Sequence, residues 1–124
     1  LTRRFGERTL LVAGLSLTGA TLLVLPYAQP YAMLFPVIIA MAAGTGMSNP
    51  SMSSLVSRSA DAHEQGMVLG LAQSLSALGR ATGPAWGGLL FEFDFHAPYL
   101  SSALLVLGAA GLALSIKKPA PREA

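Results

Sequence analysis

Four long apolar stretches constrain the fold of this 124-residue chain more than any other feature. They cover about residues 9–28, 33–57, 66–91 and 98–116. A helix needs roughly 20 mostly apolar residues to cross a hydrocarbon core of about 30 Å. The stretches are too long for strands and lack the alternation of apolar and polar residues that half-buried strands show. We therefore predict an all-α membrane protein with four transmembrane helices and a short tail at 117–124.

The composition agrees with a membrane protein. Hydrophobic residues make up 52% of the chain and charged residues only 11%, whereas ordinary globular domains carry about 25% charged residues. The absence of cysteine excludes disulfides, thiol catalysis and thiolate metal sites. The chain starts at Leu1 and lacks the pattern of a signal peptide. We expect it to be a fragment of a longer protein, with residues 1–124 forming part of one transmembrane domain.

The charged residues between the apolar stretches predict how the chain is oriented. The loop between the first two stretches and the loop between the last two carry only Glu92 and Asp94. The opposite side carries seven basic residues, namely Arg3, Arg4, Arg8, Arg58, Lys117, Lys118 and Arg122. Basic residues in short loops mark the cytoplasmic face of a membrane protein. We predict that both termini are cytoplasmic.

One charged residue, Arg80, falls inside a predicted span, near the middle of the stretch 66–91. An arginine at the bilayer centre costs about 2.5–3.5 kcal/mol on insertion scales. Gln73 and Ser76 lie on the same helical face as Arg80, because their spacing is i, i+3 and i+7. Two interpretations stay open at this point. Arg80 is held by helix-end carbonyls or an acid of a neighbouring helix, or it lines a wet cavity for substrate or coupling.

Small residues and a proline surround Arg80 in the segment "GRATGPAWGG". The residues concerned are Gly79, Gly83, Pro84, Gly87 and Gly88. Glycines spaced by four let another helix backbone approach closely. Pro84 removes one backbone donor and is expected to bend the helix. We predict that this segment is a close-packed, bent part of the third span.

The second span is polar in its half nearer the basic side, where it reads "SNPSMSSLVS". Hydrogen bonds between membrane helices contribute on average about 0.6 kcal/mol each. We favour helix packing with a kink at Pro50 over a cavity wall for this half. Asn49 is the best single candidate for a cavity residue within it.

Enzymatic chemistry is not predicted. The chain contains no P-loop, no GxSxG motif and no plausible catalytic triad. "HEQGM" lacks the second histidine of a zinc-protease motif. Glu92, Asp94 and His96 alternate in "EFDFH", and we favour an outer-loop acid cluster over a metal site there. No cofactor, metal or nucleic-acid partner is expected.

Three segments together resemble the major facilitator superfamily, in particular its drug:proton antiporter branch. "LTRRFGER" is similar to the end of the cytoplasmic loop signature called motif A, with Arg4, Gly6 and Arg8 on its basic and glycine positions. "GRATGPAWGG" is similar to the antiporter signature called motif C. "EQGMVLGLAQSLSALGR" resembles the entry to helix 11 of these transporters. Arg3 stands where motif A has an aspartate, so this copy is expected only to dock helix ends.

The resemblance implies helices 9–12 of a twelve-helix transporter, within its C-terminal six-helix bundle. The missing aspartate fits the second-half copy, and so does Ala40, which stands where the first half carries an arginine. In such transporters the substrate binds between the halves at mid-membrane. The partners implied are the lipid bilayer, the remaining helices of the transporter, a small-molecule substrate and the proton. The location implied is the bacterial inner membrane.

The function expected from the resemblance is efflux of small molecules by a secondary-active, proton-coupled transporter. No acidic residue lies inside a span, so the proton carrier is expected in the other half. One alternative is a complete four-helix transporter of the small multidrug resistance kind, although the first span lacks the glutamate of that family. A second alternative is a membrane scaffold protein that does not transport.

Overall fold

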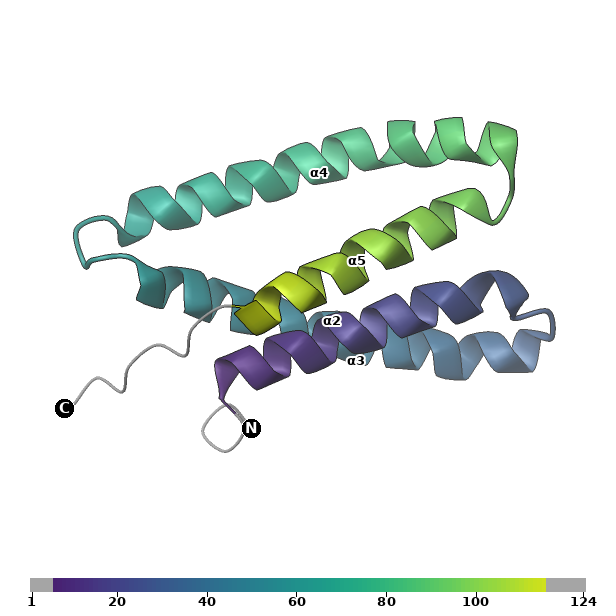
Figure 1. The fold of residues 1–124 in the computed structure, drawn as a ribbon, viewed down its shortest axis with the longest axis horizontal. Coiled ribbons are helices and arrows are strands. Elements are labelled where there is room, and N and C mark those ends of the chain that lie inside the picture. The colour runs from purple at the N-terminus through teal and green to yellow at the C-terminus, as the bar shows by residue number, and fades with distance from the viewer. Residues whose placement is uncertain (1–5, 116–124) are drawn as a thin grey trace.

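The computed structural model describes residues 6–115 as a bundle of four long helices. They are α2 (Glu7–Val24), α3 (Tyr31–Ser59), α4 (Gln65–Phe93) and α5 (Ala97–Ser115), with one short 3-10 helix, η1 (Leu25–Tyr27), after α2 (Figure 1). No strand occurs in this described part of the chain. The prediction of an all-α chain with four long helices is confirmed. Arg3, Arg4 and the tail 117–124 lie outside the described residues.

Local backbone chemistry sets the helix boundaries. Gly6 precedes α2 with a φ of +74°, a conformation that favours glycine because it has no Cβ. Pro30 caps the start of α3 in an extended conformation, where its missing N–H is not needed. Asp94 ends α4 in an extended conformation. Its carboxylate accepts a hydrogen bond from the backbone N–H of His96 at 3.0 Å, which shapes the turn into α5.

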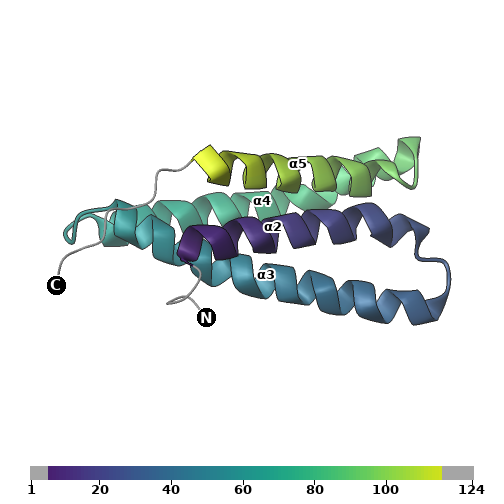
Figure 2. The same cartoon turned by 60° about the horizontal axis from the view of Figure 1, so that its bottom comes forward.

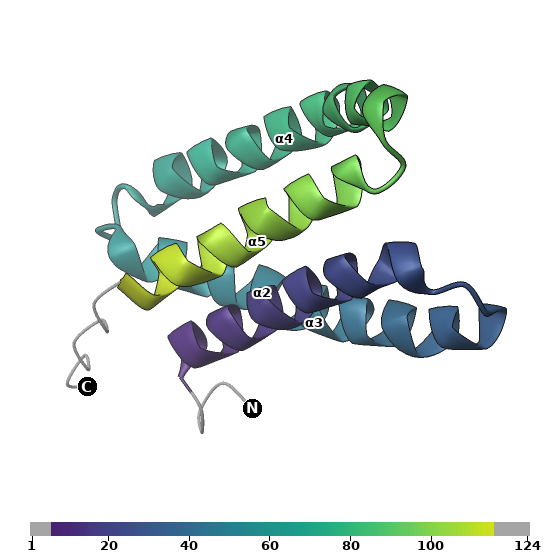
Figure 3. The same cartoon turned by 45° about the vertical axis from the view of Figure 1, so that its right-hand side comes forward.

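Successive helices run in opposite directions, so the bundle has two ends (Figure 1). We call the end where α2 and α4 begin the Glu7 end, and the end where α3 and α5 begin the Tyr27 end. Helix α2 lies beside both α3 and α5 in all three views (Figures 1, 2 and 3). In Figures 1 and 3, α4 is seen on the far side of α5 from α2. The described core is therefore built around α2.

Helices α2 and α3 cross with their backbones in direct contact. A Cβ atom added to Gly14 would lie 2.6 Å from the carbonyl oxygen of Gly44, and one added to Gly44 would lie 2.5 Å from Thr18 Oγ1. Thr18 and Ser48 are the residues four positions on in each helix, and both are buried. Small residues at this spacing permit the close approach that packs membrane helices.

Helix α5 packs on the other side of α2 through small side chains. Ala103, Ala110 and Ala113 are all buried along one stripe of α5. Near the Tyr27 end, the side chain of Leu107 fills the space in front of Gly19. Near the Glu7 end, Ala113 joins a small hydrophobic cluster with Leu11 of α2 and Leu55 of α3.

Helix α4 differs from the other three because none of its residues is buried in the described part. Three helical segments are long and apolar enough to cross a membrane, namely Glu7–Tyr27, Tyr31–Ser59 and Ala97–Ser115. Helix α4 has the length, but its polar side chains and glycines lower its hydropathy. Its last turns take a different direction from the rest of the helix (Figure 3). Pro84 precedes these turns and removes a backbone donor there.

Candidate functional site

A cavity of about 660 Å³ lies between α3 and α4 and is the candidate functional site. Its size falls in the range of about 300–1,000 Å³ that is typical of small-molecule pockets. The lining residues are Asn49, Met52, Ser53, Leu69, Ala72, Gln73, Leu75, Ser76 and Arg80. All four residues that the sequence singled out as cavity candidates, Asn49, Gln73, Ser76 and Arg80, therefore meet at one site.

Helix α3 reaches this cavity because its two sides have different partners. Gly44, Ser48 and Ser51 face α2 and are buried. Asn49 and Ser53, which lie between and beyond these residues along the chain, line the cavity on the α4 side. A helix turns by 100° per residue, so neighbouring residues serve different faces. The polar half of the second span thus combines helix packing with a cavity wall.

Three serines in this region donate their one O–H to carbonyls of their own helices. Ser51 donates to the carbonyl of Met47 at 2.7 Å, and Ser48 donates to the carbonyl of Thr45 at 3.3 Å. Ser76 of α4 donates to the carbonyl of Ala72 at 2.9 Å. Each hydroxyl oxygen keeps the capacity to accept a further bond. Of these three serines only Ser76 lines the cavity, and its hydroxyl oxygen stays available to accept a bond from a ligand.

The chemistry of the cavity wall is amphiphilic and carries one charge. Arg80 supplies a guanidinium with five donors, and Asn49 and Gln73 each supply a carboxamide that both donates and accepts. Apolar side chains, among them Met52 and Leu69, complete the wall. No acidic residue belongs to the described lining of this cavity. The site is suited to binding and orienting a small molecule.

The glycines around Arg80 have no packing partner in the described residues. A Cβ atom added to Gly79, Gly83, Gly87 or Gly88 would meet no atom within 4 Å. The close approach in the described bundle occurs instead at Gly14 and Gly44. The role of the α4 glycines stays a prediction. Pro50 and Pro84 both lie inside continuous helices.

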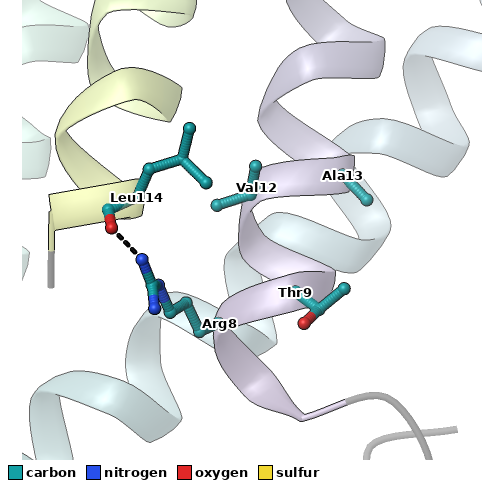
Figure 4. A pocket seen from close by; sticks show the side chains of 5 residues that line it. All are labelled: Arg8, Thr9, Val12, Ala13 and Leu114. Carbon is teal, nitrogen blue, oxygen red and sulfur yellow. Dashed lines mark hydrogen bonds between the residues drawn. The ribbon is translucent and has the colours of Figure 1, made fainter. Parts of the chain in front are cut away.

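A second polar cluster joins three helices at the Glu7 end. Arg8 donates through Nε to the carbonyl of Ala113 at 3.2 Å, and a second guanidinium nitrogen donates to the carbonyl of Leu114 (Figure 4). These carbonyls belong to the last turn of α5, where a cation also complements the helix dipole. Arg8 borders a cavity of about 370 Å³, which Thr9, Val12 and Ala13 also line. Gly6 and Arg8, two residues of the loop motif, thus shape the start of α2 and its contact with α5.

Glu7 completes this cluster on the side of α3, and the sequence prediction did not include it. One carboxylate oxygen accepts a hydrogen bond from Ser54 Oγ at 2.5 Å and lies 3.3 Å from a guanidinium nitrogen of Arg58. The Glu7 side chain is only 12% exposed. The sequence did contain one signal for such a role: Glu7 is the one acidic residue in "LTRRFGER", whose other charged residues are all arginines. Its partners on α3 follow only from the three-dimensional packing.

Aromatic and ionisable residues gather at the Tyr27 end. Phe91, Phe95 and Tyr99 pack around the turn between α4 and α5, and the rings of Tyr27 and His96 lie 5.5 Å apart. Hydrogen bonds to Asp94 from the backbone and then the ring of His96 lower the pKa of the exposed carboxyl. Among residues 6–115, no group of three metal-ligating side chains occurs.

These features define an integral membrane protein of the helical-bundle class, with a polar cavity between two of its helices. The sequence places it more narrowly. The chain belongs to the Major Facilitator Superfamily, whose family model matches residues 1–124.

Relatives of known name cover nearly the whole chain. Multidrug resistance protein 1 of Bacillus subtilis (strain 168) is 29% identical over 120 residues, which are 97% of this chain and 30% of that protein. The class D tetracycline resistance protein of Salmonella ordonez is 31% identical over 129 residues, covering 98% and 32% respectively. The synaptic vesicular amine transporter of Homo sapiens is 31% identical over 121 residues, covering 96% and 24%. The chain thus spans at most about a third of these relatives. No solved structure gives a significant match.

Proposed function

We propose that this chain is part of a secondary-active efflux transporter for small molecules, and that the cavity between α3 and α4 belongs to its substrate pathway. The observation that carries the proposal is the meeting of Asn49, Gln73, Ser76 and Arg80 at one cavity of about 660 Å³. Polar side chains inside membrane helices are costly, and they usually mark pathways for substrates or ions. The names of the relatives, which include multidrug resistance, tetracycline resistance and vesicular amine transport, support the same class.

The remaining helices of the transporter are proposed to complete the cavity. Helix α4 buries none of its residues within the described part. Its glycines face open space there. A helix with exposed small residues and a central charge is suited to packing against further helices rather than against lipid alone. In this proposal the four helices correspond to helices 9–12 of a twelve-helix transporter, and α4 to helix 11.

The proposed orientation places the Glu7 end in the cytoplasm of a bacterium and the Tyr27 end outside its inner membrane. Within the described helices and loops, the basic residues other than Arg80 are Arg8 and Arg58, and both lie at the Glu7 end. Asp94 lies at the opposite end, and Glu92 is close to it in the last turn of α4. This distribution follows the preference of basic residues for the cytoplasmic face.

Proton coupling is proposed to depend on an acid outside this chain. Every acidic residue of the described part lies in a loop or an end turn of a helix, as with Glu7 and Asp94. A proton carrier at mid-membrane would therefore come from other helices of the transporter. The full family match argues against the four-helix small multidrug resistance alternative.

The test is an efflux assay with the full-length gene product in bacterial cells that lack their own drug exporters. A panel of anionic, neutral and cationic compounds is loaded, and cellular retention is measured with and without a protonophore. We expect cells that express the transporter to retain less of some of these compounds. This difference should disappear with the protonophore, and also in the Arg80→Ala variant expressed at the same level. Unchanged retention of every compound in cells with verified membrane expression would refute transport and favour a scaffold.

A further inference from the structure

We propose that the cavity between α3 and α4 selects an anionic organic substrate, whose carboxylate- or phosphate-type group binds the guanidinium of Arg80. This inference rests on the proposed function, because it names the substrate class of the same cavity. It is carried by three properties of the site: the depth of Arg80 along α4, the lack of an acid near it in the described residues, and the composition of the cavity wall.

The position of Arg80 along α4 leaves it far from water at either helix end. Helix α4 runs from Gln65 to Phe93, and each residue adds about 1.5 Å of rise. Arg80 therefore lies roughly 20 Å from both ends of the helix. A permanently charged guanidinium at that depth needs a counter-charge or a wet cavity, since its desolvation is expensive. The cavity at its side provides the space for such a counter-charge.

The described residues offer Arg80 no carboxylate. The two ion pairs in this part of the chain join Arg58 to Glu7 and His96 to Asp94. Both lie at the ends of the bundle, and the lining of the cavity contains no acid. The one fixed charge of the described wall is therefore positive, so it attracts an anion and repels a cation.

The rest of the wall matches an organic anion rather than a bare inorganic ion. The guanidinium fork of Arg80 can bind a carboxylate or a phosphate through two parallel hydrogen bonds. Asn49 and Gln73 add neutral hydrogen-bonding groups around it. Met52 and Leu75 provide apolar surface for the body of the molecule. One cationic anchor with apolar walls is the arrangement expected for an amphiphilic acid.

The experiment compares three ligands that share one aromatic body and differ in charge. The anion 2-naphthoate, the neutral 2-naphthamide and the cation 2-naphthylmethylammonium are titrated into the full-length transporter in lipid nanodiscs, with binding measured by calorimetry. We expect naphthoate to bind at least about 10-fold more tightly than naphthamide, the ratio given by one hydrogen bond to a charged group. Naphthylmethylammonium should bind most weakly.

Variants of the cavity identify the source of this selectivity. Arg80→Gln should remove the preference for naphthoate, and Arg80→Lys should retain part of it. Gln73→Glu places a carboxylate on the same helical face as Arg80 and should weaken naphthoate binding. This second variant tests the inference if Arg80→Gln fails to fold. Ser74→Ala serves as the matched control, since Ser74 lies on α4 but does not line the cavity.

Three results would overturn the inference. Naphthoate binding no tighter than naphthamide binding would show that the wall does not select anions. A preference that survives Arg80→Gln would show that the selectivity for anions does not come from Arg80. Efflux of cations and anions alike would refute the inference but leave the proposed function standing. Selective naphthoate binding without any efflux would refute the proposed function alone.

Discussion

Gly14 of α2 and Gly44 of α3 lie so close together that a methyl group on either would overlap the opposing helix. A Cβ atom on Gly14 would sit 2.6 Å from the Gly44 carbonyl oxygen, and one on Gly44 would sit 2.8 Å from the Gly14 carbonyl oxygen. Backbone atoms cannot move aside as a flexible side chain can. This contact fixes how α3 is placed, and with it the face of α3 that lines the cavity.

Gly44→Ala should therefore destabilise the transporter. Overpacking of this kind costs about 1–3 kcal/mol, because the helices must separate to admit the methyl group. The measurement is thermal unfolding of the full-length protein in detergent. Gly46→Ala, two residues away where a Cβ meets no described atom within 4 Å, is the control. Alanine at position 46 should stabilise the helix by roughly 0.5–1 kcal/mol, because glycine is unfavourable inside a helix. Equal losses of stability in Gly44→Ala and Gly46→Ala would therefore contradict the account.

The sequence predicted the helices but not this packing. The long apolar stretches sufficed for the fold class, because an isolated span must be helical in lipid to satisfy its backbone. Spacing of small residues pointed to Gly79, Gly83 and Gly87, yet the described contact uses Gly14 and Gly44. A small residue every fourth position shows that a helix can be approached closely. Which helix approaches it is decided by the arrangement of the whole bundle.

The buried carboxylate of Glu7 leads to a second prediction. Glu7→Gln removes the charge that faces Arg58 but keeps an oxygen that can accept the bond from Ser54. Arg58 is 60% exposed, so the ion pair should contribute only about 0–1 kcal/mol. Glu7→Ala also leaves the Ser54 hydroxyl without its acceptor, a loss of about 1–3 kcal/mol. We expect unfolding temperatures to fall in the order wild type, Glu7→Gln, Glu7→Ala.

The order itself tests the description of this cluster. If Glu7→Gln were as damaging as Glu7→Ala, the charge pair with Arg58 would be the main contribution rather than the Ser54 bond. Arg58→Ala is the matched control, because it removes the cation and leaves the bond between Glu7 and Ser54 intact.

The loop at the Tyr27 end gives a prediction about pH. Hydrogen bonds from His96 stabilise the charged form of Asp94, so the pKa of this carboxyl lies below its usual value of 3.8. The hydrogen bonds between His96 and the Asp94 carboxylate are complete above pH 3.8 and are lost as the pH falls through the lowered pKa of Asp94. His96→Ala should raise the Asp94 pKa because the ring bond is removed. Carbon-13 NMR titration of labelled aspartate measures it, and an unchanged or lower pKa would be inconsistent with the geometry.

Two serines of α4 separate a cavity role from a helix role. Ser74 and Ser76 each donate to a carbonyl four residues earlier, both at 2.9 Å, but only Ser76 lines the cavity. Ser76→Ala should change the apparent KM of efflux by about 3- to 10-fold, the scale of one neutral hydrogen bond. Ser74→Ala should leave it unchanged. Efflux kinetics in inverted membrane vesicles measure both, and equal effects would place the substrate elsewhere.

The candidate site was more predictable than the packing that supports it. Gln73, Ser76 and Arg80 share a helical face by spacing alone, and polar residues on a membrane helix need a polar environment. Asn49 is the best cavity candidate of the second span by sequence, because it lies in the polar half of that span beside Pro50. The junction of these residues between α3 and α4, and the contribution of Ser53 and Met52, required the structure. Glu7 was missed because its partners lie 47 and more residues away in the chain.

The most direct test of the central claim asks whether the α3/α4 cavity is a water-filled substrate site. The chain contains no cysteine, so Gln73→Cys and Leu71→Cys introduce single thiols in this segment of the transporter. Gln73 lines the cavity, whereas Leu71 is 61% exposed and does not line it. A charged, water-soluble thiol reagent should modify Gln73→Cys faster than Leu71→Cys. A transported substrate should slow the reaction at position 73. Labelling that is equally slow at both positions, or indifferent to substrate at position 73, would contradict the account.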